Sequence, residues 1–226
     1  MTMHVRQTRP ATPVLAHEAP PLDGHDLVQA MTLMGARMSF PRNAEIYGEG
    51  EPADFVYQVV SGAVRTSKIL SDGRRQIGGF YLPGDIFGID LGDEHAFSAE
   101  AIGDVTVLYV RRRAVLALAD RNGHVARQLW AATARELSQA QRRVLLLIQS
   151  AQERLAGFLL EVAERARSGD SVDLAMTRQD IADYLGLTIE TVSRTLTALA
   201  EEAVIELPSK RRILLRDRAA LEFMSG

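Results

Sequence analysis

The chain has 226 residues, and 46% of them are hydrophobic, which is enough for a packed core and excludes a disordered chain. It contains no cysteine, which excludes disulfides, cysteine-held iron–sulfur clusters and thiol-based sensing. The net charge is −3, and residues 151–226 carry 10 Lys or Arg against 13 Asp or Glu, so total charge does not indicate a nucleic-acid partner. No apolar run approaches the roughly 18 residues of a membrane span, and no secretory signal opens the chain, so we expect a cytoplasmic protein without a membrane partner.

The first part of the chain changes from an irregular segment to a β-rich one. Residues 1–25 contain four prolines and a glycine without sustained periodicity, and we expect a flexible arm there. Residues 26–36 predict a short helix. From Met38 to about Arg112, runs such as FVYQVV and VTVLYV alternate with glycine turns, which is typical of a small barrel or sandwich. The sequence therefore predicts a β domain over residues 26–112, with a hairpin tip at residues 71–73.

A helical pattern begins at Arg113 and predicts one long helix over residues 113–150. Apolar residues and one glutamine recur in it in two interleaved seven-residue series, as in the seam of a coiled coil. The series consist of Trp130, Leu137 and Val144, and of Ala134, Gln141 and Ile148. We interpret this seam as the interface with a second copy of the chain, and packing against its own β domain is the alternative. A second amphipathic helix is predicted over residues 151–166.

A pair of short helices is predicted in the C-terminal third of the chain. Thr177 and Asp180 have the spacing of a capping box at the start of the first helix, which ends near Leu185. Gly186 supplies a turn, and Thr188 can cap the second helix. Two short helices joined by a tight turn that contains glycine form the helix-turn-helix pattern.

The second helix, predicted to end near Ala200, has one apolar face and one polar face. Its apolar face consists of Val192, Leu196 and Leu199, which have the spacing of a buried stripe. Its polar face consists of Glu190, Ser193, Arg194 and Thr197. An arginine can bond guanine O6 and N7 together, and a glutamate can accept from the cytosine amino group. We therefore predict that Glu190, Ser193 and Arg194 read DNA bases, and a solvated Glu–Arg surface pair is the alternative.

The segment after the second helix predicts a β-hairpin with a basic tip, in which the runs VIEL and ILL flank PSKRR. Such a hairpin is the wing of a winged helix-turn-helix domain over residues 151–226, and a merely solvated basic turn is the alternative. Polar and basic groups around the base-reading face are predicted to contact the DNA backbone, which positions a protein without reading sequence. These residues are Arg178, Thr188, Thr191, Thr197, Lys210, Arg211 and Arg212.

The chain resembles the CRP/FNR family of bacterial transcription regulators, and most closely its FixK-type members. The stretch SDGRRQIGGFYLPGDIFG is similar to the family's β-roll, and MTRQDIADYLGLTIETVSRTL is similar to its helix-turn-helix. The resemblance implies an α+β fold: an N-terminal antiparallel, jelly-roll-like β-roll, a long dimerisation helix and a C-terminal winged helix-turn-helix. The family signature E-x-x-S-R, here Glu190, Ser193 and Arg194, reads the half-site TTGAT. The resemblance therefore implies a homodimer on an inverted repeat of TTGAT and ATCAA.

The β domain departs from the family's known ligand sites. FNR itself holds an iron–sulfur cluster with cysteines, which this chain lacks. CRP binds cyclic AMP through a Gly-Glu-Leu turn and an Arg-Ser pair, and the similar positions here are Gly88-Ile89-Asp90 and Phe97-Ser98. Residues 76–110 contain no Lys or Arg, so a buried phosphate would lack a cation. We therefore expect no cofactor, as the resemblance to FixK-type members also implies.

The resemblance further implies an activator that contacts RNA polymerase and controls genes of microaerobic or anaerobic respiration, denitrification or nitrogen fixation. One alternative is a ligand-gated sensor of the same fold, which binds a cyclic nucleotide, or haem through His95 or His124. Another is a cupin-like metal enzyme, but only His95 falls within residues 26–112. We therefore expect neither a metal site nor an enzymatic activity.

Overall fold

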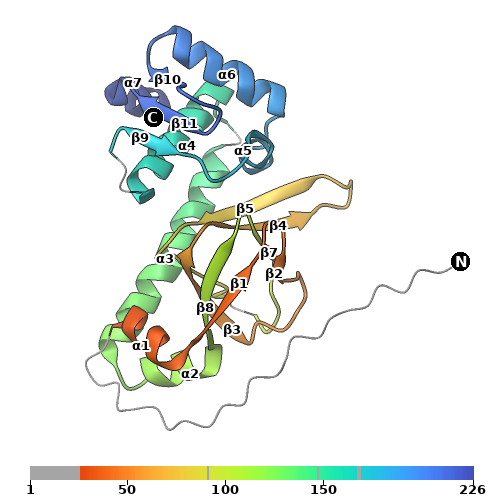
Figure 1. Cartoon of the computed structure of the whole chain (residues 1–226), viewed down its shortest axis with the longest axis vertical. Helices are drawn as coiled ribbons and strands as arrows, with labels where there is room; N and C mark the ends of the chain where they lie inside the picture. Colours follow the sequence, from red (N-terminus) through yellow and green to blue (C-terminus); the bar gives the residue numbers. More distant parts are fainter. Residues whose placement is uncertain (1–25, 91, 147, 167–168) are drawn as a thin grey trace, which may run out of the picture.

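The computed structural model of this protein describes residues 26–90, 92–146, 148–166 and 169–226 (Figure 1). The flexible arm predicted for residues 1–25 lies outside these described residues. The first described element is helix α1 (Leu27–Met34), which confirms the short helix predicted over residues 26–36. Its N-cap is Asp26, whose carboxylate accepts a hydrogen bond from the backbone N–H of Gln29 at 2.7 Å.

Eight strands then form two facing four-stranded sheets. They are β1 (Ala36–Phe40), β2 (Glu45–Tyr47), β3 (Phe55–Ser61), β4 (Val64–Ile69), β5 (Arg75–Tyr81), β6 (Ile86–Phe87), β7 (Ser98–Ala101) and β8 (Val105–Arg111). The strand orders are β1-β8-β3-β6 and β2-β7-β4-β5, and neighbouring strands are antiparallel. Val59 and Val107 from the first sheet and Val64 and Ala99 from the second are buried in one cluster between the sheets. The predicted antiparallel β-roll is therefore confirmed.

The hairpin of β4 and β5 lies at the end of the roll that faces the C-terminal domain, next to α5 (Figure 1). Its tip lies at the predicted position, because Gly73 has a φ of 84° that a residue with a side chain rarely adopts. The hairpin is paired from Val64 with Tyr81 to Ile69 with Arg75. A continuous two-stranded arm of the roll therefore ends close to the helix-turn-helix.

The prediction of a single helix over residues 113–150 is wrong, because the chain forms two helices there, α2 (Arg112–Ala119) and α3 (Gly123–Leu145). The break occurs where the side chain of Asn122 accepts from the backbone N–H of His124 and Val125, and so starts a new helix. After α3, Ser150 and Glu153 exchange side-chain hydrogen bonds with each other's backbone N–H, which starts the next helix. Ile148 consequently lies in a turn beyond α3, and not on its seam.

The C-terminal domain contains four helices and a three-stranded sheet among its described residues. They are α4 (Ala151–Ala166), β9 (Ser171–Asp173), α5 (Arg178–Leu185), α6 (Ile189–Glu201), β10 (Ile205–Glu206), β11 (Arg212–Leu215) and α7 (Arg218–Ser225). The strand order is β10-β11-β9, so the predicted wing hairpin has a third strand that the sequence did not indicate. The amphipathic helix predicted over residues 151–166 is confirmed as α4.

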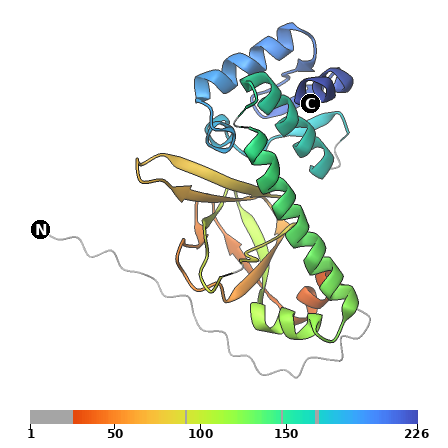
Figure 2. The ribbon, with the colours of Figure 1, turned by 180° about the vertical axis from the view of Figure 1, so that it is seen from behind.

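Helix α3 lies along one side of the β-roll and leads to the C-terminal domain (Figure 2). The two domains also share a core, in which Ile77 and Phe80 of β5 pack with residues of α4 and α5. Arg165 of α4 adds polar contacts, since it donates to the carbonyl oxygen of Phe80 and to the carboxylate of Asp85, both at 2.6 Å. Among the described residues, no helix is long and apolar enough to cross a membrane.

Candidate nucleic-acid interface

Helix α5, the first helix of the helix-turn-helix, is fixed at both ends by local hydrogen bonds. Thr177 Oγ1 accepts from the backbone N–H of Asp180 at 3.1 Å, and Asp180 Oδ2 accepts from the backbone N–H of Thr177 at 2.9 Å. This is the predicted capping box. At the other end Gly186 is left-handed, with a φ of 65°, and Arg154 of α4 donates to the carbonyl of Leu185 at 2.9 Å.

Helix α6, the predicted recognition helix, buries the predicted face. Thr188 caps it by accepting from the backbone N–H of Thr191 at 3.2 Å. Val192, Leu196 and Leu199 are all buried in the domain core, which confirms the predicted apolar stripe. The opposite face is therefore the one that remains available to a partner.

The polar face of α6 presents its predicted residues to solvent. Glu190, Arg194 and Thr197 are exposed, and Ser193 is half-buried. The pKa of Glu190 is lowered by its own backbone N–H and by the side chain of Thr188, and further by the charge of Arg194, so the carboxylate stays ionised. Among the described residues the structure records no direct ion pair between Glu190 and Arg194, although the charge of Arg194 acts on the carboxylate through space.

Arg178 and Ser193 contact each other across the two helices of the motif. The guanidinium Nη1 of Arg178 donates to Ser193 Oγ at 3.2 Å. The sequence predicted a DNA backbone contact for Arg178 and base reading for Ser193, and did not indicate their contact. The bond orients the hydroxyl on the face that also carries Glu190 and Arg194.

The wing carries the predicted basic tip between β10 and β11. Lys210 and Arg211 are exposed, while Arg212 is paired with Asp173 of β9 through two hydrogen bonds of 2.9 and 3.1 Å. Ser209 Oγ accepts from the backbone N–H groups of Arg211 and Arg212, which shapes the tip. Among the described residues, the structure records no ion pair for Lys210 or Arg211, while Arg212 is already paired with a carboxylate.

All six residues predicted for the seam are exposed, and five of them lie on α3. These five are Trp130, Ala134, Leu137, Gln141 and Val144. The exposed fractions of Trp130, Leu137 and Val144 are 78%, 60% and 63%. Own-domain packing would bury these side chains, so the alternative interpretation of the seam does not hold. The stripe is instead a long apolar surface available to another molecule.

Aromatic side chains fill the interior of the β-roll, where the sequence predicted the loss of both ligand sites. Tyr57, Phe87, Tyr81 and Tyr47 form a continuous cluster, with ring centroids 5.2 Å apart for Tyr57 and Phe87 and for Tyr81 and Phe87. Tyr81 Oη donates to Glu136 Oε1 of α3 at 3.1 Å. Burial raises the pKa of Glu136, as does the carboxylate of Asp90, against the lowering effects of the Tyr81 hydrogen bond and of Arg143.

The positions compared with the cyclic-AMP site make structural contacts. Ile89 packs against the core formed by α1, α2 and β8. Asp90 Oδ2 lies 2.7 Å from His95 Nδ1, and Asp90 Oδ1 accepts from the backbone N–H of Ala96 at 3.2 Å. The ring of His95 stacks on Tyr47 at 3.6 Å between centroids. Phe97 covers Gly78 of β5 so closely that an added Cβ there would lie 2.9 Å from the ring. His124 is exposed at the start of α3.

Comparisons with known proteins match both domains. Residues 37–122 match the cyclic nucleotide-binding domain family, and residues 153–224 match the Crp-like helix-turn-helix domain family. The nitrogen fixation regulation protein FixK of Azorhizobium caulinodans is 50% identical over 199 residues, which cover 85% of this chain and 80% of that protein. The protein of the same name from Rhizobium meliloti is 41% identical over 217 residues, 95% of each chain.

Among solved structures, FixK2 from Bradyrhizobium japonicum superimposes with a TM-score of 0.82 at 48% identity, covering 86% of this chain and 98% of that one. The similarity therefore extends over both domains and the helix between them. The chain belongs to the CRP/FNR family and is a FixK/FNR-type transcription regulator with a DNA-binding helix-turn-helix.

Proposed function

We propose that this regulator binds as a homodimer to an inverted repeat of TTGAT and ATCAA and activates transcription there without a small-molecule effector. The observation that carries the base-reading part is the polar face of α6. Glu190 and Arg194 are exposed on it, and Ser193 is oriented beside them by Arg178. Arginine and glutamate at this end of a recognition helix supply complementary groups for guanine and cytosine edges in the major groove.

The homodimer is supported by the exposed stripe of α3. An inverted repeat has two half-sites about one helical turn apart, roughly 34 Å, and a symmetric dimer places one recognition helix on each. Trp130, Leu137 and Val144 provide apolar surface that a second copy of the same helix would cover. Gln141 on the same stripe is the polar position that would fix the register between the two helices.

Independence from an effector is supported by the filled interior of the roll. The aromatic cluster lies in it and Glu136 of α3 borders it through Tyr81, while residues 76–110 supply no arginine or lysine for the phosphate of a cyclic nucleotide. Because the relatives are named as regulators of nitrogen fixation, we propose nitrogen-fixation and microaerobic genes as targets. Activation requires contact with RNA polymerase, so the proposed partners are double-stranded DNA, a second copy of this chain and RNA polymerase.

The test is binding of purified protein, free of added ligands, to a DNA duplex with the palindrome. We expect tight binding that is lost when the half-site G·C pairs are exchanged. Arg194→Ala should cost about 1–3 kcal/mol of discrimination, roughly 5- to 150-fold, at one base pair. Arg211→Ala should weaken binding to all sequences alike and flatten the salt dependence by about 0.9 in slope. Equal affinity for both duplexes would refute the proposed site, and binding only after addition of a nucleotide or haem would refute independence from an effector.

A further inference from the structure

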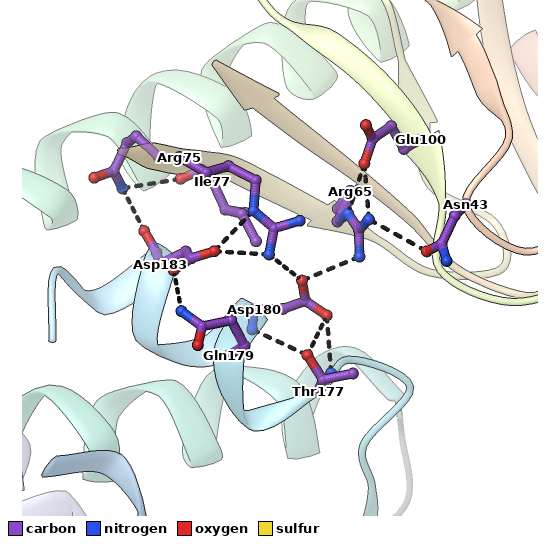
Figure 3. A network of polar contacts seen from close by, with 10 residues as sticks. Asn43, Arg65, Arg75, Ile77, Glu100, Thr177, Gln179, Asp180 and Asp183 are labelled. Atoms are coloured by element: carbon purple, nitrogen blue, oxygen red, sulfur yellow. Dashed lines mark hydrogen bonds and ion pairs between the residues drawn. The ribbon is translucent and has the colours of Figure 1, made fainter. Parts of the chain in front are cut away.

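Helix α5 carries a buried carboxylate that is held by the other domain. The side chain of Asp180 is 1% exposed, and its Oδ1 accepts from Arg75 Nη2 at 2.7 Å and from Arg65 Nη1 at 3.0 Å (Figure 3). Both arginines belong to the β4–β5 hairpin of the roll. The other oxygen of Asp180 completes the capping box with Thr177. One side chain therefore starts helix α5 and joins it to the roll.

A second set of bonds lies one helical turn further along α5. Arg75 Nε donates to Asp183 Oδ2 at 2.7 Å, so this arginine bridges both carboxylates (Figure 3). The neighbouring Gln76 donates to the carbonyl oxygen of Asp183 at 2.9 Å. The hairpin thus contacts both side chains and backbone of α5, which fixes its rotation as well as its distance from the roll.

The arginines are themselves held in place. Arg65 donates from Nε and Nη2 to Glu100 of β7 at 2.9 and 2.8 Å, and its side chain is only 10% exposed. Arg75 is fixed by its two carboxylate partners and is 25% exposed. Loss of either arginine removes one of the two cations that compensate the buried carboxylate of Asp180, and a buried charge that loses compensation is costly.

The position of α5 determines that of α6. Ile181 and Leu185 of α5 share a core with residues of α6, among them Leu196. Phe80 of β5 contacts this core through the ring of Tyr184 of α5. Two half-sites at a fixed spacing require the two recognition helices of a dimer to be held at a fixed separation. A domain that moved freely on its tether would lose that freedom on binding, which lowers affinity.

We propose that Arg65 and Arg75 are positioning residues for DNA recognition: through Asp180 and Asp183 they hold the helix-turn-helix against the roll before DNA binds. This inference rests on the proposed binding of a palindrome by a dimer, and it adds the device that presets the recognition helices. Neither arginine contacts DNA in this role, because the donors of Arg75 are engaged by carboxylates of α5 and those of Arg65 by Asp180 and by Glu100 of β7.

The first measurement needs no DNA. Since the chain has no cysteine, Glu45→Cys on β2 and Glu201→Cys on α6 introduce two exposed labels, and dilution with unlabelled chain limits the signal to one protomer. We expect a narrow distribution of the distance between the two labels in the otherwise unchanged protein. In Arg75→Gln and in Arg65→Gln we expect this distribution to be broad. Arg74→Gln is the matched control, because Arg74 is adjacent to Arg75, is 78% exposed and forms its ion pair with Asp72 of the same hairpin tip.

The second measurement is affinity for the palindrome as a function of salt. Arg75→Gln should weaken binding roughly tenfold or more with an unchanged salt slope, because no phosphate contact is lost. Asp183→Asn should also weaken binding, although removal of a negative charge would by itself strengthen attraction to DNA. Arg74→Gln should leave affinity unchanged.

Three results would overturn the proposal. The first is a broad distance distribution in the labelled protein that carries no arginine substitution, measured without DNA. The second is that the arginine variants have a distance distribution as narrow, and an affinity for DNA as high, as the Arg74→Gln control. The third is a salt slope that falls by about 0.9 in Arg75→Gln, which indicates a direct phosphate contact. If neither the parent protein nor any variant binds the palindrome, the proposed DNA site is wrong. The distance measurement then still decides whether the two arginines hold the helix-turn-helix against the roll.

Discussion

The stripe on α3 gives the sharpest quantitative prediction, for the variant Leu137→Ala. Complete burial of a leucine side chain contributes about 1.5–3 kcal/mol. Because 60% of Leu137 is exposed in the protomer, a covering second copy can gain about 1–2 kcal/mol from it. The symmetric dimer contains this residue twice, so the loss is about 2–4 kcal/mol, and the dimer dissociation constant should rise roughly 30- to 700-fold.

Sedimentation over a range of protein concentrations measures this constant directly. The matched control is Leu116→Ala, since Leu116 is an exposed leucine, at 50%, that lies on α2 away from the stripe. We expect the control to dimerise as the parent protein does. If Leu137→Ala and Leu116→Ala dimerise alike, the stripe is not the dimer interface and the reasoning from exposure is refuted.

Three further predictions concern stability. Leu196→Ala, at a position that is 1% exposed, should lower the free energy of unfolding by about 2–5 kcal/mol in denaturant titration, and a loss below 1 kcal/mol would contradict its place in the core. Gly186→Ala should cost about 1–2 kcal/mol from its left-handed φ alone, because an added Cβ there meets only Arg154 Nη1 at 3.7 Å; an unchanged melting temperature would contradict this. Glu136→Gln should be more stable than the parent at neutral pH, because the raised pKa of Glu136 in the folded state makes the parent lose stability as pH rises above the ordinary carboxyl range. Below about pH 4 the two proteins should have the same melting temperature. A difference in melting temperature that does not change with pH would refute the raised pKa of Glu136.

The helix-turn-helix was predictable because its determinants are local. The capping box of Thr177 and Asp180 spans four residues, and the buried stripe of Val192, Leu196 and Leu199 spans eight. Side chains at such spacings meet whenever the backbone is helical, whatever the rest of the chain does. The break before α3 was also signalled locally, by Asn122 followed by glycine, but the helical pattern that starts at Arg113 and the seven-residue series that starts at Trp130 outweighed that signal and led to the prediction of a helix that was too long.

The contacts of Asp180 with the roll could not be predicted in this way. Arg65 is 115 residues distant in the chain from the carboxylate it contacts, and Arg75 is 105 residues distant. Neither arginine interrupts the strand pattern of its hairpin, so nothing in the local sequence separates them from ordinary surface cations. Asp180 was predicted only as part of a capping box, a role that accounts for one of its two oxygens. A pair that forms across a domain boundary depends on the relative placement of the domains, which periodicity does not contain.

The filled roll and the ion pairs of α5 together address how a regulator without an effector could be ready to bind DNA. A ligand can shift a conformational equilibrium only by as much as its affinity differs between the two states. Here Tyr81 and Glu136 already join the interior of the roll to α3, and Arg65 and Arg75 already join its hairpin to α5. Contacts of the chain with itself thus hold both α3 and α5 to the roll. If the recognition helices are preset in this way, as we propose, little conformational equilibrium is left for an effector to shift, and these contacts favour control through the amount of protein.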